Sequence, residues 1–369
     1  MVSEIIFHEP YTQWNWQIGQ YVALVGVAAG AYLTGYLADV LALRSGKREH
    51  SQVAKYGYLS GLVIMGVSPL IMLAHLATPF RAMALPLTMS NLGSWMAIGS
   101  YLLGGFGLGA LLMFGWTAFG KARPGAPDRS GLATDGGKVT DGGTAEAATG
   151  TGGEVGGFRG VADKVGLLNG LDALADKTRP SGPVRLGIGA IFGVMAAGVL
   201  LYSAMALGSG PTGRVPLWDK TFLIPVQIVS GLGAGLAVAV GLAAVVERAT
   251  GRTVQNYSLA ASGLLVVYLL TLVATVLFLP ETNPAAAPAV GNLTGDYAAL
   301  FIGGGIVAGI VAPVTLSLAA VFGQRNGSIS AGGAAAALGV AGILAVVGKL
   351  AIAMVYLLAA NFTPLPLPV

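Results

Sequence analysis

The sequence predicts an all-α integral membrane protein with eight transmembrane helices and both termini on the outer side of the membrane. Three observations lead there. Only 10% of the residues are charged and 54% are hydrophobic, whereas soluble proteins average roughly 25% charged residues. Eight separate segments are long and apolar enough to cross a bilayer. Lysine and arginine are concentrated in every second connection between those segments.

The apolar segments set the organisation of the chain. A hydrocarbon core of about 30 Å needs about 20 helical residues, and eight stretches meet that length. They are 17–43, 56–78, 92–119, 184–207, 222–246, 257–279, 297–322 and 333–360. We therefore expect helices 1–3 in 1–120, a flexible Gly-rich cytoplasmic loop in 121–182, helix 4 with an outer loop in 183–221, and helices 5–8 in 222–369. Near the end of the long loop, VADKVGLLNGLDALADK is typical of an interfacial amphipathic helix.

The distribution of basic residues predicts the orientation. The odd-numbered connections hold sixteen Lys and Arg, against three in the even connections and the tails, which are Arg81, Arg214 and Lys220. Lys and Arg accumulate on the cytoplasmic side of membrane proteins. Both termini are thus expected to face outward across the cell (cytoplasmic) membrane. The net positive charge is explained by the basic residues on the cytoplasmic side, so nucleic acid is not an expected partner.

Two glycine motifs suggest that the chain consists of two four-helix halves. GVAAG at 26–30 and GLGAG at 231–235 occur at matching places in the first and fifth segments, and a glutamine precedes each of them, at Gln20 and Gln227. Both segments should run inward, so the echo is that of a parallel repeat. The 57 glycines predict close contacts between helices, because small residues let helix backbones approach in lipid.

Several kinds of chemistry are excluded by composition. The chain has no cysteine, so it holds no iron–sulfur cluster of its own. Of its three histidines, His8 and His50 lie outside the apolar segments, and a single remaining histidine argues against a b-type haem. Motifs for a Ser/His/Asp triad, a zinc protease or a phosphate loop are missing. Any electrons must therefore pass between a diffusible carrier and a partner that owns the metal centres.

LAHLATPFRA at 73–82 places two ionisable side chains at the outer end of the second segment. His75 can hydrogen-bond to a quinone-like ligand and exchange protons near neutral pH, or it can simply bind a backbone carbonyl. Arg81 is either an anchor in the headgroup region or a fixed positive charge beside the same pocket. Asn15 and Trp218 also fall on the outer side, where aromatic residues typically form a belt.

Two further ionisable residues suggest a proton path. Lys349 lies near the middle of the eighth segment, on one helical face with Tyr356, and a charge there costs at least about 2.5–3.5 kcal/mol. Its alternative role is that of a neutral lysine bonded to backbone carbonyls. Asp39, near the inner end of the first segment, is either a proton entrance or, more simply, a solvated surface carboxylate. At roughly 16 Å apart in depth, the two are not expected to pair.

The order of these features resembles the NrfD-like family, the membrane subunits of polysulfide reductase and related molybdopterin oxidoreductase complexes. The matching pieces are WNWQIGQYVALVGVAAGAYL, HLATPFRAMALPLTMSNLGSWMAIGSYL and YSAMALGSGPTGRVPLWDKTFLIPVQIVSGLGAGLAV. Together with the eight segments they cover most of the chain outside 121–182. Anchors of the DMSO reductase type carry an acidic residue after the SW motif, where this chain has Gly99. The resemblance is therefore closer to polysulfide reductase.

The resemblance implies a haem-free anchor of two four-helix bundles. It implies a quinone site, for menaquinone or ubiquinone, at the outer end of the first bundle, with Asn15, His75, Arg81 and Tyr202 at family positions. It also implies docking on the outer side of a ferredoxin-like iron–sulfur subunit, which connects to a molybdopterin catalytic subunit.

Two alternatives stay open beside this anchor. A secondary transporter would account equally well for eight spans, a repeat and Lys349. A simple tether for a peripheral enzyme would need no site at all.

Overall fold

The computed structural model describes residues 16–75, 93–120, 164–208 and 215–360, and most of these residues are helical. The elements are α1 (Trp16–Ser45), α2 (Arg48–His75), α5 (Trp95–Ala118), α7 (Leu168–Thr178), α8 (Gly182–Leu207), η3 (Pro216–Trp218), α9 (Lys220–Glu247), α10 (Arg252–Thr282), η4 (Pro284–Ala286), α11 (Ala287–Thr294), the π-helical η5 (Ala299–Val311), α12 (Ala312–Arg325) and α13 (Ala331–Leu358). Eight helices are long and apolar enough to span a membrane, with η5 and α12 together forming the seventh. The chain is a multi-pass membrane protein.

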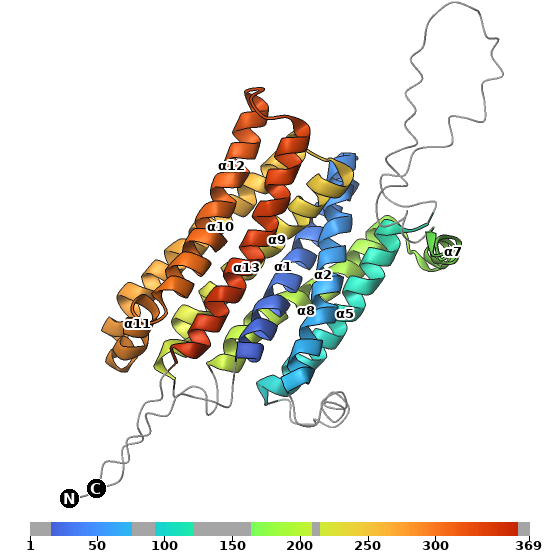
Figure 1. Cartoon of the computed structure of the whole chain (residues 1–369). Helices are drawn as coiled ribbons and strands as arrows, with labels where there is room; N and C mark the ends of the chain where they lie inside the picture. Colours follow the sequence, from blue (N-terminus) through green and yellow to red (C-terminus); the bar gives the residue numbers. More distant parts are fainter. Residues whose placement is uncertain (1–15, 76–92, 121–163, 209–214, 361–369) are drawn as a thin grey trace, which may run out of the picture.

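The long helices lie side by side in one bundle (Figure 1). α1 begins and α13 ends at the same end of it, where Gly19 packs against Leu357. We call this the outer end, following the orientation expected from the basic residues, and the opposite end, where α1 and α9 finish, the inner end.

α1 and α9 form the centre of the bundle. In their most apolar windows 78% and 67% of the residues are buried, against 33–44% in the other six spans. The two helices touch through the glycine motifs: a Cβ on Gly30 would overlap the backbone of Gly231, and one on Gly235 would overlap the backbone at Ala31. The echoed motifs are thus two sides of one contact. A duplication of the chain stays a prediction.

Contacts across the centre join the two halves of the chain. α1 packs on α2 and α8, α9 packs on α10 and α13, and α1 also packs extensively on α9. These contacts run through the whole molecule and do not divide the described residues into two separate bundles. The two-bundle grouping therefore stays a prediction.

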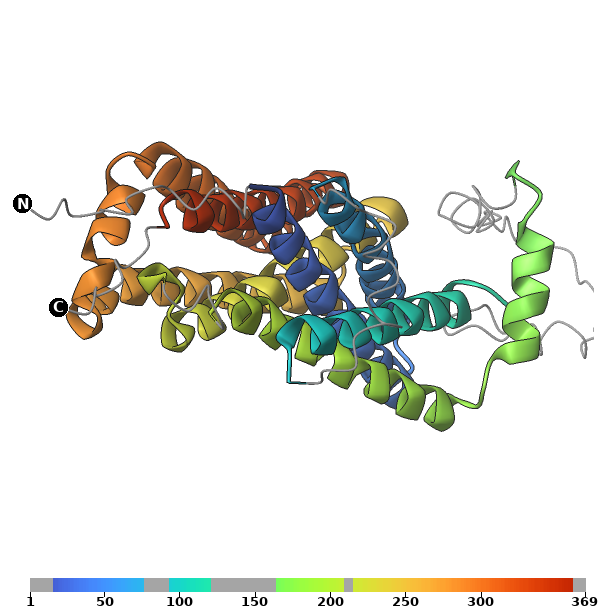
Figure 2. The same ribbon diagram turned by 90° about the horizontal axis from the view of Figure 1, so that it is seen from below.

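α7 confirms the helix expected near the end of 121–182, although it begins at Leu168, within the amphipathic stretch and not at its start. It runs across the direction of the long helices (Figure 2) and is tied to the end of α5. The Trp116 indole donates to Thr178 Oγ1 at 3.1 Å, and Asp172 accepts from the Gly120 amide at 2.7 Å. Polar contacts with α5 therefore hold this helix.

The helices extend beyond the apolar segments at the inner end. α2 begins at Arg48 and α10 at Arg252, earlier than the expected starts at 56 and 257. Lys55, counted in a loop by its charge, lies within α2 and forms an ion pair with Glu247 of α9. Hydropathy detects only the part of a helix that lies in hydrocarbon, which is why the polar first turns of these helices escaped it.

Candidate functional site

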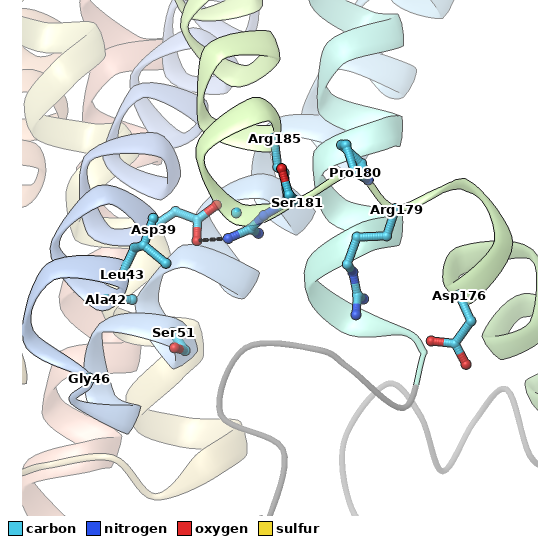
Figure 3. A pocket seen from close by; sticks show the side chains of 11 residues that line it. Asp39, Ala42, Leu43, Gly46, Ser51, Asp176, Arg179, Pro180, Ser181 and Arg185 are labelled. Atoms are coloured by element: carbon cyan, nitrogen blue, oxygen red, sulfur yellow. Dashed lines mark hydrogen bonds and ion pairs between the residues drawn. The ribbon is translucent and has the colours of Figure 1, made fainter.

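An open cavity of about 600 Å³ lies at the inner end, between the end of α1 and the start of α8 (Figure 3). Asp39 and Arg185 line its inner wall. Oδ1 of Asp39 accepts a hydrogen bond from Nη2 of Arg185 at 2.7 Å. Figure 3 shows Arg179 and Asp176 on the far side of the cavity from Asp39. Arg179 donates there to the carbonyls of Trp116 and Phe119 at the end of α5.

The expectation of a solvated Asp39 is wrong. Its exposed fraction is 1%, and that of Arg185 is 3%. Sequence reasoning counted Arg185 among the loop charges, but α8 begins at Gly182, with Pro183 in its first turn, so Arg185 is already helical and packs inward. A lone buried carboxylate needs a counter-charge. The sequence did not indicate that Asp39 is buried, so it carried no signal for this pair.

Tyrosines continue from this ion pair into the bundle. The Tyr58 hydroxyl donates to Oδ2 of Asp39 at 3.4 Å, and its ring packs edge-on against Tyr32, with the ring centroids 5.2 Å apart. The Tyr32 hydroxyl donates to the Gly189 carbonyl at 3.1 Å. One face of α1 thus carries buried polar groups from Asp39 toward the middle of the bundle.

Lys349 lies in a second polar cluster, buried between α9, α10 and α13. Its Nζ donates to Gln227 Oε1 at 3.2 Å and to Ser230 Oγ. It is 3% exposed and forms no ion pair with any described residue. The neutral-lysine alternative expected backbone carbonyls as partners, whereas the structure supplies two side chains from α9. Gln227 is the glutamine that precedes the second glycine motif.

Small residues make room for Lys349. A Cβ on Gly26 would lie 3.2 Å from both Cε and Nζ of the lysine. Gly348, its neighbour on α13, is in such close contact with Gly309 of η5 that a Cβ on either would overlap the other backbone. The cavity beside the amine measures only about 10 Å³ and is also lined by Tyr268 and Tyr356. It has room for about one water molecule.

Asp39 and Lys349 do not pair, as expected. Lys349 lies against Gly26, and Asp39 follows thirteen residues further along α1, a rise of about 20 Å. The two buried charges are therefore separate sites, at the inner end and in the middle of the bundle. From Asp39, the side chains of Tyr58 and Tyr32 lead toward the middle of the bundle.

At the outer end the structure describes part of the predicted quinone site. Tyr202 lies near the end of α8 and is 8% exposed, with Tyr21 of α1 as a neighbour. Asn15 and Arg81 lie outside the described residues. His75 is the last residue of α2, and its side chain lies outside the described part. Their assembly around a ligand stays a prediction.

Trp218 does not belong to the expected aromatic belt. It lies in η3, 1% exposed, and its indole donates to the carbonyl of Tyr356 at 2.9 Å. The next residue, Asp219, caps α9 by accepting from the Thr221 amide at 2.8 Å. Residues 216–218 of the outer connection are therefore buried in the protein, at the end of α13 that carries Tyr356.

Comparison with known families decides the membership of the chain. The family model described as polysulphide reductase, NrfD, matches residues 4–362. The chain belongs to the NrfD family. A search of curated proteins finds no match. The matched range includes Asp39, Tyr202 and Lys349.

Within this NrfD chain, the absence of a side chain at Gly99 has a steric reason. A Cβ at Gly99 of α5 would overlap the ring of Tyr202. The position after the SW motif is thus filled by the tyrosine ring from α8. An acidic side chain at position 99 would displace Tyr202, so an acid and this placement of the ring exclude each other.

Proposed function

We propose that the chain is a haem-free quinone-binding anchor that passes electrons between the membrane quinone pool and an iron–sulfur partner of a molybdopterin oxidoreductase complex. The observation that carries the proposal is the NrfD match over residues 4–362, nearly the whole chain. The proposal includes the grouping into two four-helix bundles, outward-facing termini, and docking of the partner on the outer side of the cytoplasmic membrane.

The described part of the outer site fits a quinone. The Tyr202 hydroxyl can donate a hydrogen bond to a ring carbonyl, and Gly99 lets its ring lie against α5. Bound quinone would supply the redox chemistry, because a chain without cysteine holds no iron–sulfur cluster of its own. Asn15 and Arg81 would orient the ring, and His75 would exchange a proton with water.

Proton translocation is the second part of the proposal. The buried pair of Asp39 and Arg185 lines the open inner cavity, which would admit water to it, and Lys349 holds an amine in the middle of the bundle. Asp39 would take protons from the inner side, and Lys349 would be a later group on the path. Buried ionisable groups in membrane spans typically mark such routes.

The quinone site is tested by electron transfer in the purified complex. We expect His75→Ala and Arg81→Ala to slow quinol-dependent reduction of the partner cluster by about 10²-fold, the usual contribution of a proton-transferring group. Lys220→Ala is the matched control, because Lys220 is an exposed cation at the outer end. Unchanged rates in both site variants would show that the site is assigned to the wrong residues.

Lys349→Met separates the anchor from a secondary transporter. The substitution removes the only cation among the described residues that line the small cavity. For the anchor, we expect electron transfer to continue while proton translocation in proteoliposomes falls to about a tenth or less, since one transferring group is worth at least that much. Ser230→Ala keeps the amine and should have a smaller effect.

A transporter gives the opposite pattern. Solute uptake would stop in Lys349→Met, and the protein would work without partners. Co-purification of an iron–sulfur and a molybdenum protein through detergent excludes a lone transporter, and bound quinone in that preparation excludes a mere tether.

A further inference from the structure

A second open cavity, of about 640 Å³, lies at the inner end of the other half of the chain. It is lined by Arg252, Gln255 and Asn256 of α10 and by Arg325 of α12. The two helices are in contact, so the cavity sits between neighbouring spans. Two of the four described residues that line it are arginines, and none of the four is acidic. These residues suit a negatively charged ligand. The cavity is separate from the Asp39–Arg185 pair and from the Lys349 cluster.

A hydrogen-bond network orients Arg325. Gln255 is 6% exposed, and its Nε2 donates to the Thr250 carbonyl at 3.2 Å and to Gln324 Oε1 at 3.1 Å. Its Oε1 is thereby turned to accept from Nε of Arg325 at 2.9 Å. A guanidinium has five N–H donors. The other four N–H groups of Arg325, on its two Nη atoms, form no hydrogen bond with the described residues. These two Nη groups form a planar fork that suits the oxygens of a phosphate group.

Neither arginine has an acidic partner in the described part of the chain. Glu49 lies close to the start of α10, but its Oε2 accepts from the Thr253 amide at 3.2 Å and so caps the helix. Two guanidinium groups without counter-ions at one cavity attract a negative ligand.

The depth of the cavity identifies the source of that ligand. Arg252 is the first residue of the sixth span and Arg325 the last of the seventh, which is the level of lipid headgroups. From Asn256, one face of α10 continues into the membrane through exposed apolar residues at helical spacing, namely Ala260, Gly263, Val267 and Leu270. A ligand with a phosphate at the cavity could lay an acyl chain along this face.

We propose that the cavity between α10 and α12 binds the headgroup phosphate of an anionic phospholipid. Arg252 and the fork of Arg325 hold the phosphodiester, Gln255 positions Arg325, and the apolar face of α10 receives an acyl chain. Basic pockets between spans on the cytoplasmic side are typical of such sites. A zwitterionic headgroup adds a cation beside two arginines and is disfavoured.

The test measures binding of phosphatidylglycerol to the delipidated full chain in detergent, by native mass spectrometry. We expect the dissociation constant to rise about tenfold in the Arg252→Gln, Arg325→Gln double variant, because each charge-assisted hydrogen bond contributes to affinity. Arg248→Gln is the matched control, since Arg248 is exposed at the same end but does not line the cavity. Circular dichroism checks that all variants keep their helices.

Three outcomes would overturn the proposal. One is equal affinity in the double variant and in Arg248→Gln. Another is equally tight binding of phosphatidylcholine. The third is displacement of the lipid by millimolar inorganic phosphate, which would make free phosphate the ligand. Arg325→Lys keeps the charge but loses the bond to Gln255, so it should bind with intermediate affinity, and wild-type affinity would remove the positioning role of Gln255.

Discussion

Arg185→Met is expected to lower the free energy of unfolding by about 3–5 kcal/mol, because it leaves a buried carboxylate without its counter-charge. The side chains of Arg185 and Asp39 are 4% and 1% exposed. Asp39 would keep only the long hydrogen bond from Tyr58, at 3.4 Å. Equilibrium unfolding in detergent measures the loss.

The matched control removes both charges. Asp39→Leu with Arg185→Met should recover most of the stability, since replacing a whole buried ion pair with apolar side chains is often neutral. Lys55→Met breaks the more exposed pair with Glu247, whose side chains are 21% and 11% exposed, and should cost less. A double variant as unstable as Arg185→Met would contradict the explanation by buried charge. If Asp39 is the inner proton entrance, the stable double variant should also lose proton translocation.

Gly30→Ala is expected to destabilise the protein by about 1–3 kcal/mol or more, the usual cost of overpacking. The added Cβ overlaps the carbonyl group of Gly231. Backbone atoms cannot turn aside as a flexible side chain can, so α1 and α9 must move apart along the most buried contact in the bundle. Thermal unfolding in detergent measures the change.

Gly263→Ala provides the control for helix propensity. Gly263 lies within α10, and a Cβ there meets nothing within 4 Å. This variant should be neutral or more stable by about 0.5–1 kcal/mol, because alanine has a higher helix propensity than glycine. Gly235→Ala, which meets α1 from the opposite side, should behave like Gly30→Ala. Equal stability of Gly30→Ala and Gly263→Ala would mean that the two helices do not approach this closely.

The spans could be predicted almost in full, but their polar ends could not. Each of the eight apolar segments coincides with a helix long and apolar enough to span a membrane in the described part of the chain, since apolar length alone decides the crossing of a bilayer. Tertiary contacts decide whether a helix continues beyond its apolar segment. The residues in question are Arg48 and Lys55 of α2 and Arg252 of α10. Lys55 continues the helix with Glu247 of α9 as its partner.

The candidate sites were predictable only as single residues. Lys349 stood out because a cation in an apolar segment is rare, yet its partners Gln227 and Ser230 are ordinary residues more than one hundred positions away in the chain. Arg185 was hidden among loop charges. Gly99 was visible as a departure from the family pattern, but its reason, the ring of Tyr202, lies on another helix.

The sequence by itself determined the membrane class, the eight spans, the expected orientation and the rare ionisable residues. These follow from transfer free energies that each segment contributes nearly independently. Only the tertiary structure decided which polar groups meet, such as Asp39 with Arg185 and Lys349 with Gln227. Lipid gives helices no hydrophobic reason to choose a partner. The choice therefore depends on backbone contacts like that of Gly30 with Gly231, a steric fit between two surfaces that no single segment contains.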